Sequence, residues 1–405
     1  MNRYIHYVFI ATLLSNLLFF SILPILGISY SAGEDSSIYK AFCIILSGYS
    51  VFYIIRYFLL KQKLRASLEN IVFLLVPLLF TLMLIVESPE SSFPYEIFKR
   101  FIMWGCPSIL IALYYSHNPH EVKMTIRPWF ISVVILSIGS LLSVYNSLVE
   151  LNLDDVLGER YQTISYSAAL AYCISLFLLL DPKFSDIKCG KIVLFLCICM
   201  QIIAVIASGG RGGFLLLFFG TLSYIFLGVR YFNLSKTFVI KLLIFLVGAI
   251  ILVYPILIEN SILERGLDRV LSYISASGID MSETSNRDSV YGVAIREIKN
   301  HLIIGQGIFK HMDLMGYPHN LILEVLMGGG IIYFSIYLLL NLVFIMKLYY
   351  MLRNNLLHVT IIPPLIYVFI LLMFSGTYLE TSMFWFVITY VLCYKCKRLK
   401  IDKIK

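Results

Sequence analysis

Long apolar segments alternate with short polar segments along almost the whole chain. A transmembrane helix needs about 20 apolar residues to cross a hydrocarbon core of roughly 30 Å. The apolar runs lack the period-two alternation of a membrane β-barrel. The pattern predicts an all-α polytopic membrane protein in which residues 1–405 form one integral membrane domain of about twelve transmembrane helices. The predicted helices lie near residues 7–27, 41–60, 70–86, 97–116, 129–149, 164–180, 192–207, 213–229, 238–258, 319–346, 359–374 and 379–394.

The composition agrees with a lipid environment. Of the 405 residues, 60% are hydrophobic and only 14% are charged, and the mean hydropathy is +0.86. A water-exposed surface does not tolerate such a composition. The first apolar run is longer than the hydrophobic region of a signal peptide and lacks a small-x-small cleavage site, so it is predicted to be retained as a helix. Most cysteines lie in apolar runs, which favours packing residues over a disulfide framework.

Lysine and arginine residues are distributed unevenly between the polar segments. If the N-terminus is cytoplasmic, most of the 32 Lys and Arg residues fall on the cytoplasmic side, as the positive-inside rule requires. Both termini are therefore predicted to be cytoplasmic, and the net charge of +8 follows from membrane topology. The basic tail from Lys395 to Lys405 needs only anionic lipid headgroups as partners, so no nucleic acid is expected.

One long polar segment, residues 259–318, lies outside the membrane between the ninth and tenth predicted helices. Within it, residues 286–301 place Val290, Ala294 and Ile298 at positions i, i+4 and i+8. This spacing puts three apolar side chains on one face of a helix. The sequence therefore predicts a large loop that contains a short amphipathic helix.

Three arginines on the outer side precede or begin helical segments. Arg160 comes before the sixth predicted helix, Arg211 before the eighth, and Arg287 begins the loop helix. Free backbone N–H groups and a partial positive charge make helix N-termini suitable for anions. Gly210 and Gly212 flank Arg211 and would let backbone amides approach a phosphate closely. These features predict a diphosphate site; the alternative is that the glycines serve only a tight turn and the arginines are solvated.

A polar cluster opens the tenth predicted helix. His319 and Asn320 lie at its start, and an imidazole titrates near neutrality, which suits a general base. Glu324 follows five residues later, inside the membrane, where a carboxylate is expected to face the bundle interior and to have a partner such as an arginine. His301 and His311 are also predicted to be outside, but their spacing does not predict a metal site.

Three segments resemble those of the O-antigen ligase and O-antigen polymerase superfamily, membrane glycosyltransferases of the GT-C kind that use undecaprenyl-diphosphate-linked sugars. The segments are Ser208 to Leu215 (SGGRGGFL), Arg287 to Gly307 (RDSVYGVAIREIKNHLIIGQG) and Pro318 to Ile332 (PHNLILEVLMGGGII). They occur in the family's order and on the predicted outer side. The resemblance covers mostly residues 150–335.

The resemblance implies a periplasmic active site in a bacterial inner membrane, with a lipid-linked oligosaccharide as donor and no metal or cofactor. The catalytic residues would be His319, which would deprotonate or orient the acceptor hydroxyl, and Arg211 and Arg287, which would hold the diphosphate. Membrane lipids and a chain-length regulator protein are the other expected partners. The further substrate-binding residues would be Arg160, Asn320, Glu324, Gly210 and Gly212.

Three functions fit this site. The first is an O-antigen polymerase that joins lipid-linked repeat units. The second is a ligase that transfers the glycan to lipid A-core, and the motifs do not separate it from the polymerase. The third is a transporter or flippase of lipid-linked sugars. The last is disfavoured because the sequence predicts no broken helices in matching halves and places its charges at the surface rather than at the bilayer midplane.

Overall fold

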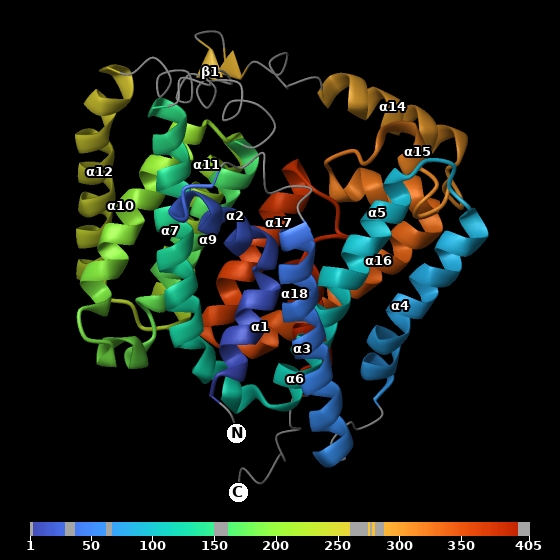
Figure 1. The fold of residues 1–405 in the computed structure, drawn as a ribbon, viewed down its shortest axis with the longest axis horizontal. Helices are drawn as coiled ribbons and strands as arrows, with labels where there is room; N and C mark the ends of the chain where they lie inside the picture. The colour runs from blue at the N-terminus through green and yellow to red at the C-terminus, as the bar shows by residue number, and fades with distance from the viewer. Residues whose placement is uncertain are drawn as a thin grey trace, which may run out of the picture.

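Helices form every long element of the computed structural model, which describes residues 3–28, 37–61, 67–149, 161–259, 274–275, 278–279 and 287–395 (Figure 1). The first half contains α1 (Ile5–Leu13), α2 (Ser15–Ile25), α3 (Ser37–Lys61), α4 (Leu68–Glu87), α5 (Phe93–Arg100), the π-helix η1 (Phe101–Gly105), α6 (Cys106–His117), the 3₁₀-helix η2 (Pro119–Thr125), α7 (Ile126–Val149), α9 (Tyr161–Leu178) and the 3₁₀-helix η3 (Pro182–Asp186).

The second half begins with α10 (Gly190–Ser208), α11 (Arg211–Tyr231) and α12 (Lys236–Glu259). A two-residue strand pair follows, in which β1 (Ile274–Ser275) lies antiparallel to β2 (Gly278–Ile279). The chain continues with α14 (Arg287–Asn300), α15 (Met312–Met315), α16 (Leu321–Arg353), the 3₁₀-helix η4 (Val359–Ile361), α17 (Ile362–Phe374) and α18 (Ser382–Cys393).

Seven helical stretches of the described residues are long and apolar enough to cross a membrane. The pair α1 and α2, bent by 92°, adds an eighth if it counts as one span. Large apolar side chains cover the outer faces: Phe226 on α11 is 65% exposed and Leu339 on α16 is 63% exposed. In water such faces would be unfavourable, whereas lipid accommodates them. The helices therefore indicate a polytopic, membrane-embedded protein.

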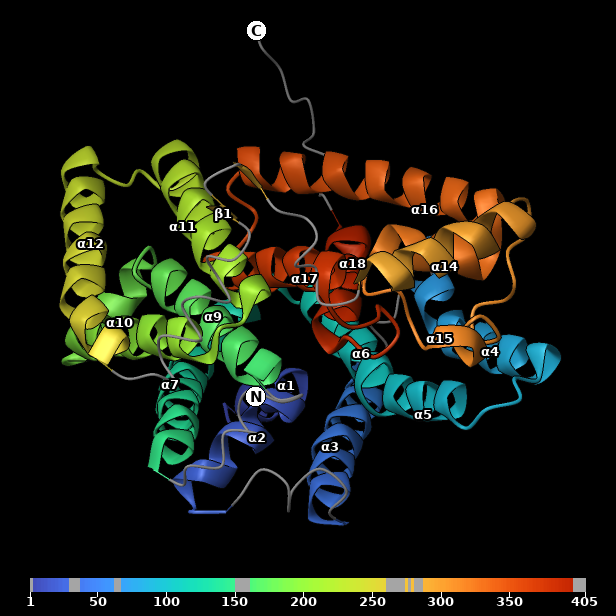
Figure 2. The same ribbon diagram turned by 90° about the horizontal axis from the view of Figure 1, so that it is seen from above.

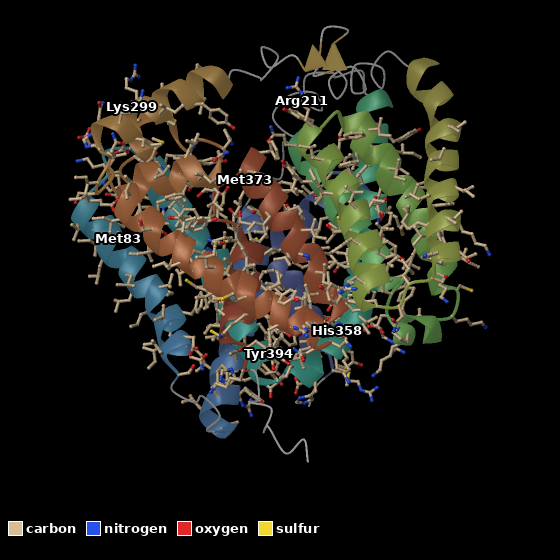
Figure 3. The ribbon with its side chains drawn as sticks, turned by 180° about the vertical axis from the view of Figure 1, so that it is seen from behind. Met83, Arg211, Lys299, His358, Met373 and Tyr394 are labelled. Atoms are coloured by element: carbon tan, nitrogen blue, oxygen red, sulfur yellow. The ribbon has the colours of Figure 1, made fainter. Side chains whose placement is uncertain are left out.

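Each of the predicted apolar runs contains a helix, but the helices differ in length. The last two, α17 and α18, have 13 and 12 residues. At 1.5 Å per residue they are about 20 Å long, whereas the hydrocarbon core is about 30 Å thick. Met373, near the end of α17, lies between Arg211 at one end of the molecule and His358 and Tyr394 at the other (Figure 3). The turn between α17 and α18 thus lies within the helical bundle.

Most of the helices from α4 onward fall into three groups, and the central group contains this turn. Seen from above, α6, α17 and α18 lie near the centre, with α7 and α9 to α12 on one side and α4, α5 and α14 to α16 on the other (Figure 2). The start of α1 and the end of α18 lie at one end of the molecule, and α14 and the strand pair lie at the opposite end (Figure 1). Segments from both halves of the chain therefore meet at the centre.

The long helix α16 is broken at Gly330, and residues 302–307 fill the break. Gly330 has φ 60° and ψ −158°, a combination that only glycine adopts readily. Four backbone hydrogen bonds join the two segments: Gln306 N–H to Met327 carbonyl (2.8 Å), Gly307 N–H to Gly328 carbonyl (2.9 Å), Ile331 N–H to Leu302 carbonyl (2.9 Å) and Ile332 N–H to Ile303 carbonyl (3.3 Å). The break therefore leaves these peptide groups satisfied.

Two carboxylates connect the segment that precedes α16 with the end of α4 and the turn before α5. Glu87 accepts the backbone N–H groups of residues 308–310, at 2.8, 2.6 and 3.1 Å. Asp313 accepts the backbone N–H groups of Glu90 and Ser91, at 2.8 and 3.0 Å, and the Ser91 hydroxyl at 2.6 Å. Hydrogen bonds to charged acceptors are among the stronger ones in proteins. The start of α5 is thereby held against the segment that leads into α16.

A pH-dependent stability is expected from His311, which is buried in the same segment. Its Nδ1–H donates to the Gly307 carbonyl at 2.9 Å. Burial lowers the pKa of His311 to about 4, against the opposing effects of Gly307 and Asp313. The unfolded chain takes up a proton near pH 6.5, whereas the folded chain resists protonation until about pH 4. This contribution to stability is therefore complete above pH 6.5 and is lost as the pH falls toward 4.

Thermal unfolding of the detergent-solubilised protein between pH 7 and pH 4 would measure this effect, with His311→Asn as the matched variant. The amide can still donate to Gly307 but does not titrate in this range. The variant should lose less stability on acidification than the wild type. Parallel curves for the two proteins would contradict the assignment.

Candidate functional site

The glycines around Arg211 allow α9 and the start of α11 to pack closely. A Cβ atom at Gly212 would lie 1.8 Å from the hydroxyl oxygen of Tyr166. A Cβ atom at Gly210 would lie 2.2 Å from the hydroxyl oxygen of Ser165, which itself donates to the Gly210 carbonyl at 3.1 Å. The glycine-rich motif thus has a helix-packing role, which the sequence analysis did not anticipate: its two alternatives for these glycines were phosphate binding and a tight turn.

Two substitutions, the second of which compensates for the first, test whether packing alone explains the glycines around Arg211. Gly210 has φ −78°, which alanine adopts without strain, so Gly210→Ala should destabilise the protein only through its clash with Ser165. Overpacking of this kind costs about 1–3 kcal/mol. Adding Ser165→Gly removes the clashing atoms and should restore the amount of folded protein in the membrane. If activity also returns, Gly210 acts by packing alone; if only folding returns, its backbone also has a role at the site.

His319 lies in the turn that precedes α16. Its φ is +52°, in the left-handed region, and its ring packs edge-on against Tyr317 with centroids 4.8 Å apart. Asn320 is the N-cap residue of α16, and its side chain accepts the N–H groups of Ile322 and Leu323 at 3.0 and 3.2 Å. An N-cap of this kind stabilises a helix start. Asn320 therefore sets the turn that carries His319.

Glu324 is buried and accepts a hydrogen bond from the hydroxyl of Thr377. The sequence predicted an arginine as its partner, so this prediction is corrected: the hydrogen bond comes from a neutral hydroxyl. The same Thr377 oxygen accepts the N–H of Leu379 at 3.2 Å, and Thr381 donates to the Thr377 carbonyl at 2.8 Å. Glu324 therefore organises the turn at residues 375–381, between α17 and α18.

The three predicted arginines differ in how far the structure describes them. Arg160 lies outside the described residues. Arg287 is the first residue of α14, and its side chain also lies outside the described part. Arg211 begins α11 and lies near the end of the molecule that carries the strand pair (Figure 3). Its position places a cation and a helix N-terminus at the same end as α14.

A polar cavity of about 330 Å³ lies inside the bundle. This volume falls in the range of about 300–1,000 Å³ that small-molecule sites occupy. Its polar lining includes Ser15, Asn16, Arg100, Gln162, Thr163, Tyr166, Tyr317, Tyr367, Ser375, Glu380, Thr381 and Ser382. These groups donate and accept hydrogen bonds in many directions, as a ligand rich in hydroxyl groups requires.

Interruptions in three helical segments surround this cavity. The first is the bend between α1 and α2, where the Ser382 hydroxyl donates to the Leu13 carbonyl at 2.7 Å. The second is the π-helix η1, which begins directly after Arg100, and the third is the turn at residues 375–381. At membrane depth, irregular backbone is tolerated only where it is buried in protein or lines a cavity. Short π-helices also occur frequently at functional sites.

Arg100 and Glu380 form an ion pair at the wall of this cavity. The guanidinium nitrogen and the carboxylate oxygen are 3.0 Å apart, and the two side chains are 44% and 17% exposed. The guanidinium carbon also lies 6.0 Å from the ring centre of Trp104. The sequence prediction missed this pair. The available signal was Arg100 inside the apolar run 97–116, with an acid as the second residue of the last predicted helix.

Two tyrosines of the cavity wall pack against the segments that the sequence singled out, although Arg211, His319 and the other described site residues do not line the cavity themselves. On one side it is lined by Tyr166, the residue that packs against Gly212 beside Arg211. On another side it is lined by Tyr317, whose ring contacts His319. Ser375 donates to Gln162 across the cavity wall at 3.0 Å. The Arg211 and His319 segments therefore border one polar space through their neighbouring tyrosines.

Within the described ranges, no three His, Cys, Asp or Glu side chains are grouped as metal ligands. Comparisons with protein-family models, with curated proteins and with solved structures found no match. The fold and the cavity define the class of protein: a polytopic α-helical membrane protein with an internal polar cavity.

Proposed function

We propose that this protein is a membrane glycosyltransferase that uses a lipid-diphosphate-linked oligosaccharide as donor and acts as an O-antigen polymerase. The observation that carries the proposal is the polar cavity with its Arg100–Glu380 ion pair, whose lining includes Tyr166, packed against Gly212, and Tyr317, packed against His319. The resemblance of those segments to the O-antigen polymerase and ligase superfamily supplies the reaction class. A GT-C-like fold of about twelve spans, with cytoplasmic termini and a periplasmic site, belongs to the same proposal.

In the proposed reaction, an acceptor hydroxyl attacks the anomeric carbon of the donor sugar. A new glycosidic C–O bond forms, and the bond between the anomeric carbon and the diphosphate oxygen breaks. His319 orients the acceptor and takes its proton. Arg211, together with Arg287 and Arg160, stabilises the negative charge on the leaving diphosphate. Arg100 extends this cationic surface to the wall of the cavity.

The structure changes the proposed role of two predicted substrate-binding residues. Asn320 caps α16 and Glu324 holds the 375–381 turn. Both therefore act by positioning the residues that face the cavity. A lipid-linked repeat unit as acceptor gives a polymerase, and lipid A-core as acceptor gives a ligase. A chain-length regulator protein remains a proposed partner of the polymerase.

The lipopolysaccharide banding pattern of a deletion strain tests the proposal. The strain is complemented with the wild type, Arg211→Ala or His319→Ala at matched membrane levels, with Arg353→Ala on the exposed end of α16 as control. A single core-plus-one-unit band in the deletion and in both site variants supports the polymerase. Core without any unit, with polymer accumulating on the carrier lipid, supports the ligase. Unchanged ladders in both site variants would exclude these residues from the chemistry.

A transporter of lipid-linked sugars is the second candidate, and a specific observation favours it. The sequence predicted no broken helices in matching halves and placed most charges at the surface, whereas the structure has a 92° bend between α1 and α2, a break at Gly330 and a partly buried ion pair at the cavity wall. Transporters often build their sites from such interruptions. Proteoliposomes that contain the lipid-linked repeat unit distinguish the two: movement of the unit across the bilayer with no lengthening of the glycan supports transport, and lengthening of the glycan supports the polymerase.

A further inference from the structure

A second and larger cavity opens between α3 and the continuous helix formed by α5, η1 and α6. Its volume is about 830 Å³. The side chains of Ile44, Phe52 and Ile102 contribute to its wall and are 61%, 63% and 43% exposed. We refer to this cavity as the α3–α6 groove. An exposed apolar groove in a membrane protein faces lipid chains rather than water.

The charged residues of the α3–α6 groove lie together. The Ser47 hydroxyl donates to the Met103 carbonyl at 2.7 Å, which fixes the level at which α3 crosses η1. Lys40 lies about two turns before Ser47 on α3, and Lys99 and Arg100 come just before Met103. The same end contains one carboxylate, that of Glu96. Glu380 pairs with Arg100 from the neighbouring cavity, so three cations meet two carboxylates and this end stays positive, while the groove beyond Ser47 is mainly apolar.

The α3–α6 groove meets the polar cavity at two residues. Arg100 and Trp104 line both spaces. A molecule that occupies both must therefore be apolar along the groove, anionic near Arg100 and polar in the cavity. A polyprenyl diphosphate that carries a sugar has these three parts in this order. An ordinary phospholipid matches the groove and its positive end but has no large polar part for the cavity.

We propose that the α3–α6 groove binds the diphosphate-proximal isoprene units of a polyprenyl-diphosphate donor, with Lys40, Lys99 and Arg100 contacting the phosphate next to the lipid chain and the polar cavity receiving its sugar. This inference rests on the proposed function and adds the position of the lipid carrier. A groove of this volume accommodates only the first part of a long chain. The remainder of the chain extends into the bilayer.

Gly48 provides a direct test, because it lines the groove and a Cβ atom there would have no neighbour within 4 Å. Gly48→Leu should fill the groove without a clash, and leucine also favours a helix more than glycine does. The matched control is Gly248→Leu on α12, where a Cβ atom likewise meets nothing within 4 Å. The measurement is the affinity of purified protein in nanodiscs for undecaprenyl diphosphate, read by native mass spectrometry or by displacement of a fluorescent analogue.

Gly48→Leu should weaken undecaprenyl diphosphate binding about tenfold, the effect of displacing about two methylenes, while Gly248→Leu should leave it unchanged. Lys40→Ala with Lys99→Ala should weaken binding of undecaprenyl diphosphate but not of undecaprenol. Equal affinity in wild type and Gly48→Leu would overturn the proposal, as would equally effective displacement by phosphatidylglycerol. Because this assay measures lipid binding without sugar transfer, it can disprove the groove while the polymerase proposal stands. It can also support the groove if the polymerase assay is negative.

Discussion

Replacing Arg100 by alanine should reduce sugar transfer about 10²- to 10³-fold, the usual effect of removing one group that stabilises a developing oxyanion. Arg100 faces both the polar cavity and the α3–α6 groove, and its side chain is 44% exposed despite its ion pair. Initial rates with a purified lipid-linked donor, at matched protein levels in nanodiscs, would measure the effect. Arg353→Ala, on the exposed end of α16, is the control and should retain full activity.

The alternative role for Arg100 is to neutralise Glu380. Removing one member of a partly buried pair leaves the other uncompensated and destabilises the fold. The double variant Arg100→Gln with Glu380→Gln separates the two roles, since it removes both charges and keeps polar side chains. If Arg100 contacts the diphosphate, the double variant folds but stays inactive. Recovery of activity in the double variant would mean that the only role of Arg100 is to neutralise the charge of Glu380.

Replacing Gly330 by alanine should prevent stable folding of the α14 to α16 unit. Its φ and ψ angles cost a non-glycine residue about 1–3 kcal/mol. In addition, a Cβ atom would lie 2.5 Å from the carbonyl carbon and oxygen of Ile303, which are backbone atoms and cannot rotate away. Relieving this contact would break the hydrogen bonds between residues 302–307 and 327–332. The amount of protein in the membrane and its thermal unfolding in detergent would both measure the loss.

Gly292→Ala is the matched control for this prediction. Gly292 lies within α14, and a Cβ atom there would meet nothing within 4 Å. Alanine in a helix interior is more favourable than glycine by about 0.5–1 kcal/mol, so this variant should be as stable as the wild type or slightly more so. Equal stability of Gly330→Ala and Gly292→Ala would show that the break in α16 is not required.

The sequence was informative where local pattern decides structure. Every predicted apolar run contains a helix, because a span of apolar residues has few other ways to satisfy its backbone in lipid. The helix predicted for residues 286–301 corresponds to α14, from Arg287 to Asn300. Ala294, on the predicted apolar face of α14, is fully buried, whereas Arg296, which lies off that face, is 67% exposed. A period of 3.6 residues is sufficient to separate these two faces.

Contacts between segments far apart in the sequence could not be predicted from local pattern. Arg100 and Glu380 are 280 residues apart, and no local pattern pairs them. The glycines beside Arg211 looked like a phosphate cradle, but each is also required by a side chain of α9. Glu324 was assigned an arginine and instead accepts from Thr377. In each case the partner lies on another helix, and its identity depends on how the helices pack.

The sequence alone thus determined that this chain is a bundle of apolar helices with a polar segment between α12 and α16, because hydropathy and helical periodicity act over short stretches. It also marked the segments around Arg211 and His319 as unusual. Tertiary structure alone decided where α16 breaks, which helices stop short of a full span, and that a tyrosine packed against each segment lines one cavity with an ion pair in its wall. These features arise from the mutual packing of several helices, which no single stretch of sequence specifies.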